Sequence, residues 1–282
     1  MPYIILILCL AAATALQFLT GDFPVRFFAF PLNLIIALLW ICAMLFLWNN
    51  RRKSMFVEFM LSRGATVWAI VLFLLFGLIM GVTGIRSVAQ SWPFVIAMLY
   101  FQTVLFFVLL RGWRAPTATG ARLGSVRWRF VLNHLGILLA VSSAFWGAPD
   151  SETLRVRAVK GLPAKEAITM DGSAYWLPYE VELEDFTMNV YENGTPSMYE
   201  ASVLIDDVPV TLRVNHPYQI SFGEDLYLVG YDMYSAGDPD YCILQIVREP
   251  WKYPAVAGIV LMLMGALLLF AAGPKKRYGE DD

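Results

Sequence analysis

Long apolar runs separated by short polar stretches fill the first half of the chain. Five of them carry few or no charges and are about as long as a membrane-spanning helix, which needs roughly 20 residues: 2–19, 30–48, 66–84, 93–110 and 130–147. A sixth run, 253–271, lies close to the C-terminus. The pattern predicts a membrane α-helical protein with about six transmembrane helices.

A polar segment, 149–251, separates the last two runs and has the two-residue alternation of β-strands. Its apolar positions change phase between Leu183 and Phe186, which predicts a bulge near Glu184 and Asp185. Turn-forming residues suggest hairpins at Asn193-Gly194, Asp206-Asp207 and 235–240. We therefore expect an all-β domain, either a small antiparallel sandwich or an open barrel.

The expected organisation has three parts. A membrane domain of five helices covers 1–148, the β domain covers 149–251, and the sixth helix with a basic tail covers 252–282. Composition agrees with a membrane protein, since 58% of residues are hydrophobic and 16% are charged. In soluble domains about 45–50% of residues are apolar and about a quarter are charged.

Basic residues indicate how the helices are oriented. Short cytoplasmic loops are rich in Lys and Arg, and basic groups follow the second run, the fourth run and the last run: Arg51, Arg52, Lys53 and Arg63; Arg111, Arg114, Arg122, Arg127 and Arg129; Lys275, Lys276 and Arg277. Both termini are therefore expected in the cytoplasm and the β domain outside. That domain is acidic, with 7 Lys and Arg against 18 Asp and Glu over 149–252, a net charge of −11.

The N-terminal run differs from a cleaved leader. No basic residue precedes it, and Leu8 stands before Cys9, where a lipoprotein signal needs a small residue. We expect it to be a retained helix.

The chain has two histidines, and no nucleophile–base set is visible, so no catalytic residue is assigned. His134 lies in the apolar run 130–147. It could reach the membrane interface or bond a neighbouring helix, but ionisable groups inside membrane helices often mark ligand sites, and imidazole is a good haem ligand. Gly136, nearby, could let a flat ring approach. His216 precedes a proline in "VNHPYQI", as expected for a strand end or turn.

Several segments, in order, resemble the ResB family, the CcsB-like half of the system II cytochrome c synthase. The similar segments are "LTGDFPVRFFAFPLNLIIALLWICAMLFLWN", "NHLGILL", "VELEDFTMNVYENGTPSMYEASVLIDD", "LRVNHPYQISFGEDLYLVGYD" and "REPWKYPAVAGIVLMLMGALLLF". Two features depart from the family: an extra helical hairpin, 66–110, precedes the His134 helix, and the tryptophan-rich haem motif of the partner subunit is absent.

The resemblance implies a multi-pass protein of the bacterial inner (cytoplasmic) membrane that acts in cytochrome c biogenesis. With a ResC/CcsA-like partner it would carry haem b across the membrane and support its covalent attachment to apocytochrome c; no nucleic acid is involved. His134 is then the candidate haem axial ligand and His216 a second, less favoured candidate, with no metal beyond the haem iron. The chain would be one subunit of a haem lyase complex and not a catalyst alone.

A different class stays open: a multi-pass transporter or sensor component with an extracytoplasmic ligand-binding β domain. Such a protein would be expected to place polar groups at midplane. Asn33 and Gln102 are the candidates that the apolar runs offer.

Overall fold

The computed structural model describes residues 2–113, 127–191, 196–232 and 239–271. The chain divides into two compact units, a helical unit formed by 1–149 and 252–282 and a β unit formed by 150–251. Several predicted features lie outside the described residues: Arg114, Arg122, the tail residues Lys275, Lys276 and Arg277, the Asn193-Gly194 turn and most of the turn at 235–240.

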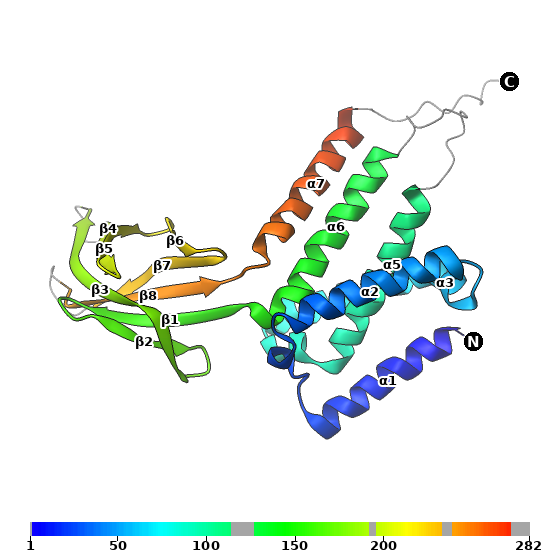
Figure 1. The fold of residues 1–282 in the computed structure, drawn as a ribbon, viewed down its shortest axis with the longest axis horizontal. Coiled ribbons are helices and arrows are strands. Elements are labelled where there is room, and N and C mark those ends of the chain that lie inside the picture. Colours follow the sequence, from blue (N-terminus) through cyan, green and yellow to red (C-terminus); the bar gives the residue numbers. More distant parts are fainter. Residues whose placement is uncertain (1, 114–126, 192–195, 233–238, 272–282) are drawn as a thin grey trace. The chain divides into compact units, whose positions relative to one another are not determined.

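Six helices in the described part of the chain are long and apolar enough to span a membrane, which confirms the predicted fold class (Figure 1). They are α1 (Pro2–Thr20), α2 (Leu32–Asn50), α4 (Arg63–Thr83), α5 (Trp92–Trp113), α6 (Trp128–Gly147) and α7 (Lys252–Ala271). Short helical segments lie between successive helices: η1 (Val25–Phe28), α3 (Met55–Met60) and η2 (Arg86–Gln90). A further turn, η3 (Ala148–Asp150), leads from α6 to the first strand of the β unit.

Helix α4 begins three residues before the predicted run because a serine caps it. The Ser62 hydroxyl accepts a hydrogen bond from the Ala65 backbone N–H at 3.1 Å, which satisfies a donor that the first turn otherwise leaves free. The helix ends where Gly84 adopts a left-handed conformation (φ 65°), a common helix terminator. Ser62 lies before the predicted run, and Gly84 is its last residue.

Helix α5 is the central helix of the helical unit. Of its membrane-spanning window 67% is buried, against 28% or less for the other five. It contacts α1, α2, α4 and α6, and Phe101, Val104 and Phe107 belong to the main apolar cluster of the unit. Most side chains of the other helices stay exposed, as expected for surfaces that face lipid.

Helices α6 and α7 pack against each other more extensively than any other pair of elements. Glycines permit the close approach: a Cβ at Gly258 would lie 2.6 Å from the Ala140 backbone nitrogen, and one at Gly265 would lie 2.7 Å from the Asn133 amide. Small residues at helix contacts are typical of membrane proteins.

The β unit is one antiparallel sheet of eight strands, in the order β5-β4-β3-β2-β1-β8-β7-β6. The first strand, which follows α6, therefore pairs with the last, which precedes α7. The strands are β1 (Glu152–Val159), β2 (Ala164–Thr169), β3 (Ala174–Val190), β4 (Pro196–Ile205), β5 (Val208–Arg213), β6 (Tyr218–Ser221), β7 (Glu224–Tyr231) and β8 (Tyr241–Arg248).

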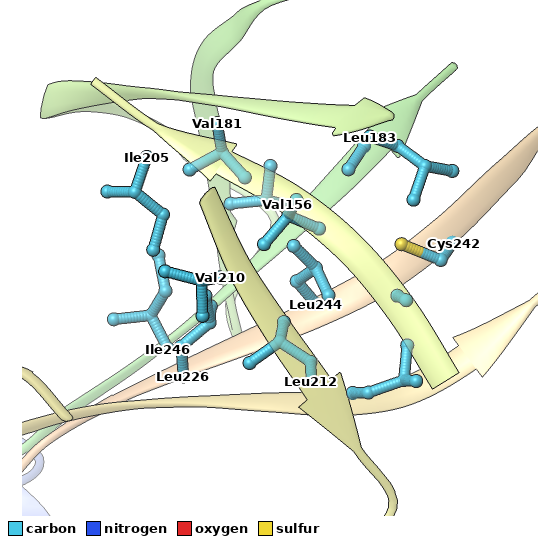
Figure 2. Close-up of a cluster of buried hydrophobic side chains, with 14 of the residues drawn as sticks. Val156, Val181, Leu183, Ile205, Val210, Leu212, Leu226, Cys242, Leu244 and Ile246 are labelled. Atoms are coloured by element: carbon cyan, nitrogen blue, oxygen red, sulfur yellow. The ribbon is translucent and has the colours of Figure 1, made fainter. Parts of the chain in front are cut away.

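One face of this sheet carries the core of the β unit (Figure 2). Alternate residues along the strands, such as Leu154, Val156 and Ala158 on β1, are fully buried. Strands β5 and β7 contact each other although they are not neighbours in the sheet. The sheet therefore curls around its core, which fits the predicted open barrel and not the two-sheet sandwich.

Two local predictions for this unit are confirmed. The register of β3 against β4 shifts between Leu183 and Asp185, where the phase change predicted a bulge. Asp206 (φ 46°) and Asp207 (φ 64°) form the two-residue connection between β4 and β5. Positive φ at both central residues is the geometry of a type I′ hairpin turn.

Candidate functional site

His134 lies in the N-terminal half of α6 and is half-buried. Its Nδ1 is 2.8 Å from the carbonyl oxygen of Phe130, one helical turn earlier. A carbonyl only accepts hydrogen bonds, so this contact requires the tautomer in which Nδ1 carries the proton. In a neutral ring with this tautomer the lone pair is on Nε2, which is the arrangement found in metal-binding histidines whose second nitrogen is held by a backbone oxygen.

The imidazole ring is held by an aromatic neighbour. The rings of Phe130 and His134 stack with centroids 3.9 Å apart and an interplanar angle of 26°. Phe130 in turn occupies space that a side chain at Gly112 of α5 would fill, since a Cβ there would lie 1.8 Å from the ring. The orientation of His134 therefore depends on the packing of α5 against α6.

The interpretation of Gly136 as an opening for a flat ring is wrong. A Cβ at Gly136 would lie 2.6 Å from the Gly258 carbonyl oxygen and 2.6 Å from Cγ of Met262. Helix α7 already fills that space, so Gly136 serves helix packing. Any ring bound at Nε2 of His134 must approach from another side of α6.

His216 is in the turn after β5, as its sequence context predicted. Its backbone N–H donates to the Arg213 carbonyl at 3.0 Å, and its side chain is exposed. With Glu200, Thr211 and Arg213 it lines an open recess of about 350 Å³. The guanidinium of Arg213 pairs with Glu200. The two histidines thus belong to different compact units.

Gln102 and Asn33, the polar candidates for a transporter core, are both buried and both bonded to α6. The Gln102 side-chain oxygen accepts hydrogen bonds from the Ser142 hydroxyl at 2.9 Å and the Trp146 indole at 3.1 Å. The Asn33 amide donates to the Trp146 carbonyl at 2.8 Å. These bonds hold α2, α5 and α6 together, as polar side chains often do between membrane helices.

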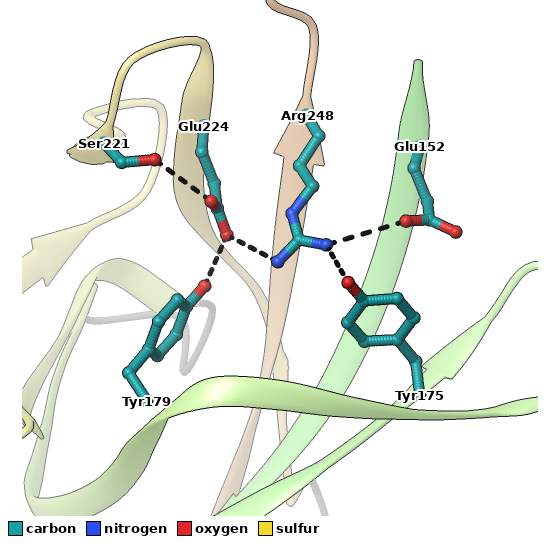
Figure 3. A network of polar contacts seen from close by, with 6 residues as sticks. All are labelled: Glu152, Tyr175, Tyr179, Ser221, Glu224 and Arg248. Carbon is teal, nitrogen blue, oxygen red and sulfur yellow. Dashed lines mark hydrogen bonds and ion pairs between the residues drawn. The ribbon is translucent and has the colours of Figure 1, made fainter. Parts of the chain in front are cut away.

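Sequence reasoning missed a buried polar network in the β unit, centred on Arg248 and Glu224 (Figure 3). Their side chains are 3.2 Å apart and only 19% and 11% exposed. Tyr179 and Ser221 donate to the two carboxylate oxygens of Glu224 at 2.6 and 3.1 Å. Burial and the bond to Glu224 raise the pKa of the Tyr179 hydroxyl well above its ordinary value.

The other side of Arg248 is satisfied as well. One guanidinium nitrogen donates to the Tyr175 hydroxyl at 2.6 Å and lies 3.6 Å from the Glu152 carboxylate. The network therefore joins β1, β3, β6, β7 and β8 at one edge of the core. The available signal was a lone arginine that ends an apolar strand, "YCILQIVR", but the sequence does not say which acid faces it.

Among the described residues, no group of three or more His, Cys, Asp or Glu side chains could hold a metal ion. Cys242, the cysteine of the β unit, is fully buried in β8, and burial raises the pKa of its thiol to about 12. It behaves as a small apolar side chain.

Comparison with known proteins bears on the family. Residues 121–239 match the sequence model of the ResB-like family, a span that covers the His134 helix and most of the β unit. No curated protein matches the chain.

One solved structure, "Cytochrome c Heme Lyase CcmF", is 13% identical and aligns with 70% of this chain and 33% of its own, with a TM-score of 0.38. The chain thus spans about a third of that structure. No conclusion about function is drawn from a likeness this distant. The family match supports a role in cytochrome c biogenesis, which the resemblance implied. Residues 121–239 of this chain are therefore similar to the ResB-like family, as the sequence predicted.

Proposed function

We propose that this protein guides haem b across the membrane for covalent attachment to apocytochrome c, together with a ResC/CcsA-like partner. In the reaction that the complex would serve, a cysteine thiol adds across a haem vinyl group, so one C–S bond forms and the thiol hydrogen goes to the vinyl carbon. No redox change accompanies that addition. The chain would bind and orient the haem, and the partner would complete the site.

The observation that carries the proposal is the contact between Nδ1 of His134 and the Phe130 carbonyl oxygen. In a neutral imidazole this contact leaves the lone pair on Nε2, which is the form that binds haem iron. The stacking on Phe130 limits rotation of the His134 ring, so the side chain loses less conformational entropy when a ligand binds. Backbone and ring contacts thus prepare this histidine for an axial position.

A partner is needed because this chain supplies one such ligand. Haem carriers commonly bind the iron from two sides and hold the porphyrin in a pocket. His216 is exposed beside Arg213 and remains only a second candidate. We further propose that both termini face the cytoplasm and that the β unit lies outside, where it would meet the apocytochrome; this rests on the basic loops.

His134→Ala tests the proposal in the full chain expressed with its partner. Haem bound to the purified complex, read from its absorption spectrum, should fall strongly, and so should maturation of a reporter cytochrome c. The amount of protein in the membrane should stay near normal. Added imidazole should restore part of both signals, because it can occupy the position that the side chain left.

His216→Ala is the matched comparison, since it removes the other imidazole from an exposed turn. We expect it to retain most of the haem. Full haem content and normal maturation in His134→Ala would refute the proposed ligand. Copurification of a second polytopic protein tests the partner, and maturation by this chain alone would exclude the need for one.

A further inference from the structure

The helical unit contains a cavity of about 700 Å³ that the proposed haem ligand does not touch. It is lined where α5 begins and α6 ends, with contributions from α2, α4 and the turns η1 and η2. Aromatic side chains dominate its wall: Phe23, Phe28, Phe73, Trp92, Phe145 and Trp146. The volume is in the range of pockets that hold one small molecule.

The wall is apolar, with three residues that have polar side chains: Asn33, Trp92 and Trp146. Two of these are already bonded within the protein, since Asn33 donates to the Trp146 carbonyl and the Trp146 indole donates to Gln102. The third is different. The indole Nε1 of Trp92 is buried and has no hydrogen-bond partner among the described residues.

A buried N–H without an acceptor destabilises the folded protein. Other contacts keep this indole in place: Phe23 packs edge-on against it at 4.9 Å, and the Trp92 backbone N–H donates to the Gln17 side chain at 3.0 Å. Because Trp92 lines the cavity, a small shift of its ring that uncovers the N–H would let an acceptor in the cavity remove this destabilisation. The cavity therefore favours a ligand with one acceptor oxygen on a largely apolar body.

The lack of basic side chains in the lining excludes anionic ligands. The residues that line the cavity include no Lys, Arg or His, so a carboxylate or phosphate buried there would have no counter-ion. The propionates of a haem would likewise have no basic partner among the lining residues. Trp92 and Trp146 lie at helix ends, where tryptophans mark the membrane–water interface. Lipid-soluble molecules with carbonyl groups are available at that depth.

We propose that this cavity binds a lipid-soluble molecule whose carbonyl oxygen accepts a hydrogen bond from the Trp92 indole. The acyl ester of a glycerolipid and the ring carbonyl of an isoprenoid quinone share this chemistry. The proposal is independent of haem binding, because His134 does not line the cavity.

The experiment uses the purified, delipidated full chain in detergent. Two probes differ only in the carbonyl: a phosphatidylethanolamine with ester-linked chains and its ether-linked analogue. Decylubiquinone is the third probe. The protein should bind the ester lipid or the quinone saturably. Loss of one neutral hydrogen bond should weaken binding roughly three- to tenfold, so Trp92→Phe should bind the successful probe that much less tightly.

Trp68→Phe is the matched control, because Trp68 lies on α4, is 49% exposed and does not line the cavity. It should bind as the unaltered protein does. If the ester lipid binds, Trp92→Phe should also abolish its preference over the ether lipid; if only the quinone binds, the quinone is the ligand. Failure of both carbonyl probes to bind would overturn the proposal. So would equal binding by Trp92→Phe, or an ether lipid that binds as tightly as the ester.

Discussion

Arg248 should be the most costly single side chain to remove from the buried network of the β unit. Arg248→Met keeps the apolar stem but leaves Glu224, whose side chain is 11% exposed, as a buried charge without its cation. Breaking such a pair costs about 3–5 kcal/mol. Tyr179 and Ser221 still donate to the carboxylate, so we expect the lower end, about 3 kcal/mol.

Cys242 offers a local assay for this loss. Its thiol is inaccessible in β8 and its pKa is raised to about 12, so a maleimide should react only when the sheet opens. In a background with Cys9→Ala and Cys42→Ala, Arg248→Met should accelerate labelling roughly a hundredfold, since about 1.4 kcal/mol corresponds to a factor of ten. The measurement is the rate at which maleimide labels the full chain, under conditions where the sheet closes faster than the maleimide reacts.

Two further variants decide whether burial of the charge is the cause. Lys165→Met breaks an ion pair with Glu180 in which both side chains are about half exposed; such pairs are worth less than about 1 kcal/mol, so labelling should rise less than about fivefold. Glu224→Gln combined with Arg248→Met removes the charge and should recover much of the loss. If Arg248→Met and Lys165→Met label at the same rate, the reasoning is refuted.

Three other predictions concern packing, ionisation and a turn. Gly136→Leu should lower the thermal stability of the protein in detergent, because α7 occupies the space of its side chain, whereas Gly77→Leu should be tolerated, since nothing lies within 4 Å of its Cβ position. Tyr179 ionises near pH 10 when unfolded but only at higher pH when folded; its contribution to stability is complete below pH 10 and declines above it, and Tyr179→Phe should flatten that decline in pH-dependent unfolding. Asp207→Gly should stabilise the β unit by roughly 1 kcal/mol, because glycine adopts positive φ without strain; slower labelling of Cys242 would show it.

Local patterns were sufficient for much of the fold. The apolar runs identified six helices because a membrane span depends on length and composition alone. The phase change before Phe186 located the bulge, and Asp206-Asp207 located a turn, because both effects are contained in a few neighbouring residues. The bond from His134 to Phe130 is likewise a contact between adjacent turns of one helix.

Contacts between distant segments could not be predicted in the same way. Whether Gln102 faces lipid or α6 depends on how the helices pack, which their nearly uniform hydrophobicity does not encode. Gly136 was misinterpreted because an absent side chain serves ligand approach and helix contact equally well in a sequence. The pairing of Glu224 with Arg248 requires the register of β7 against β8, and the cavity beside Trp92 requires four helices together.

The adjacency of β1 and β8 has a consequence for the order of assembly. Glu152 pairs with Arg248, and the Trp251 indole donates to Asp150 at 2.6 Å, so the ends of an insert of about 100 residues must meet. Closing a free loop of that length costs about 4 kcal/mol in chain entropy. Helices α6 and α7 precede and follow the insert and pack against each other, so a helix pair that forms first would bring the two ends together. A membrane-inserted helix pair would thus act as the nucleus that makes the central strand pairing a local event.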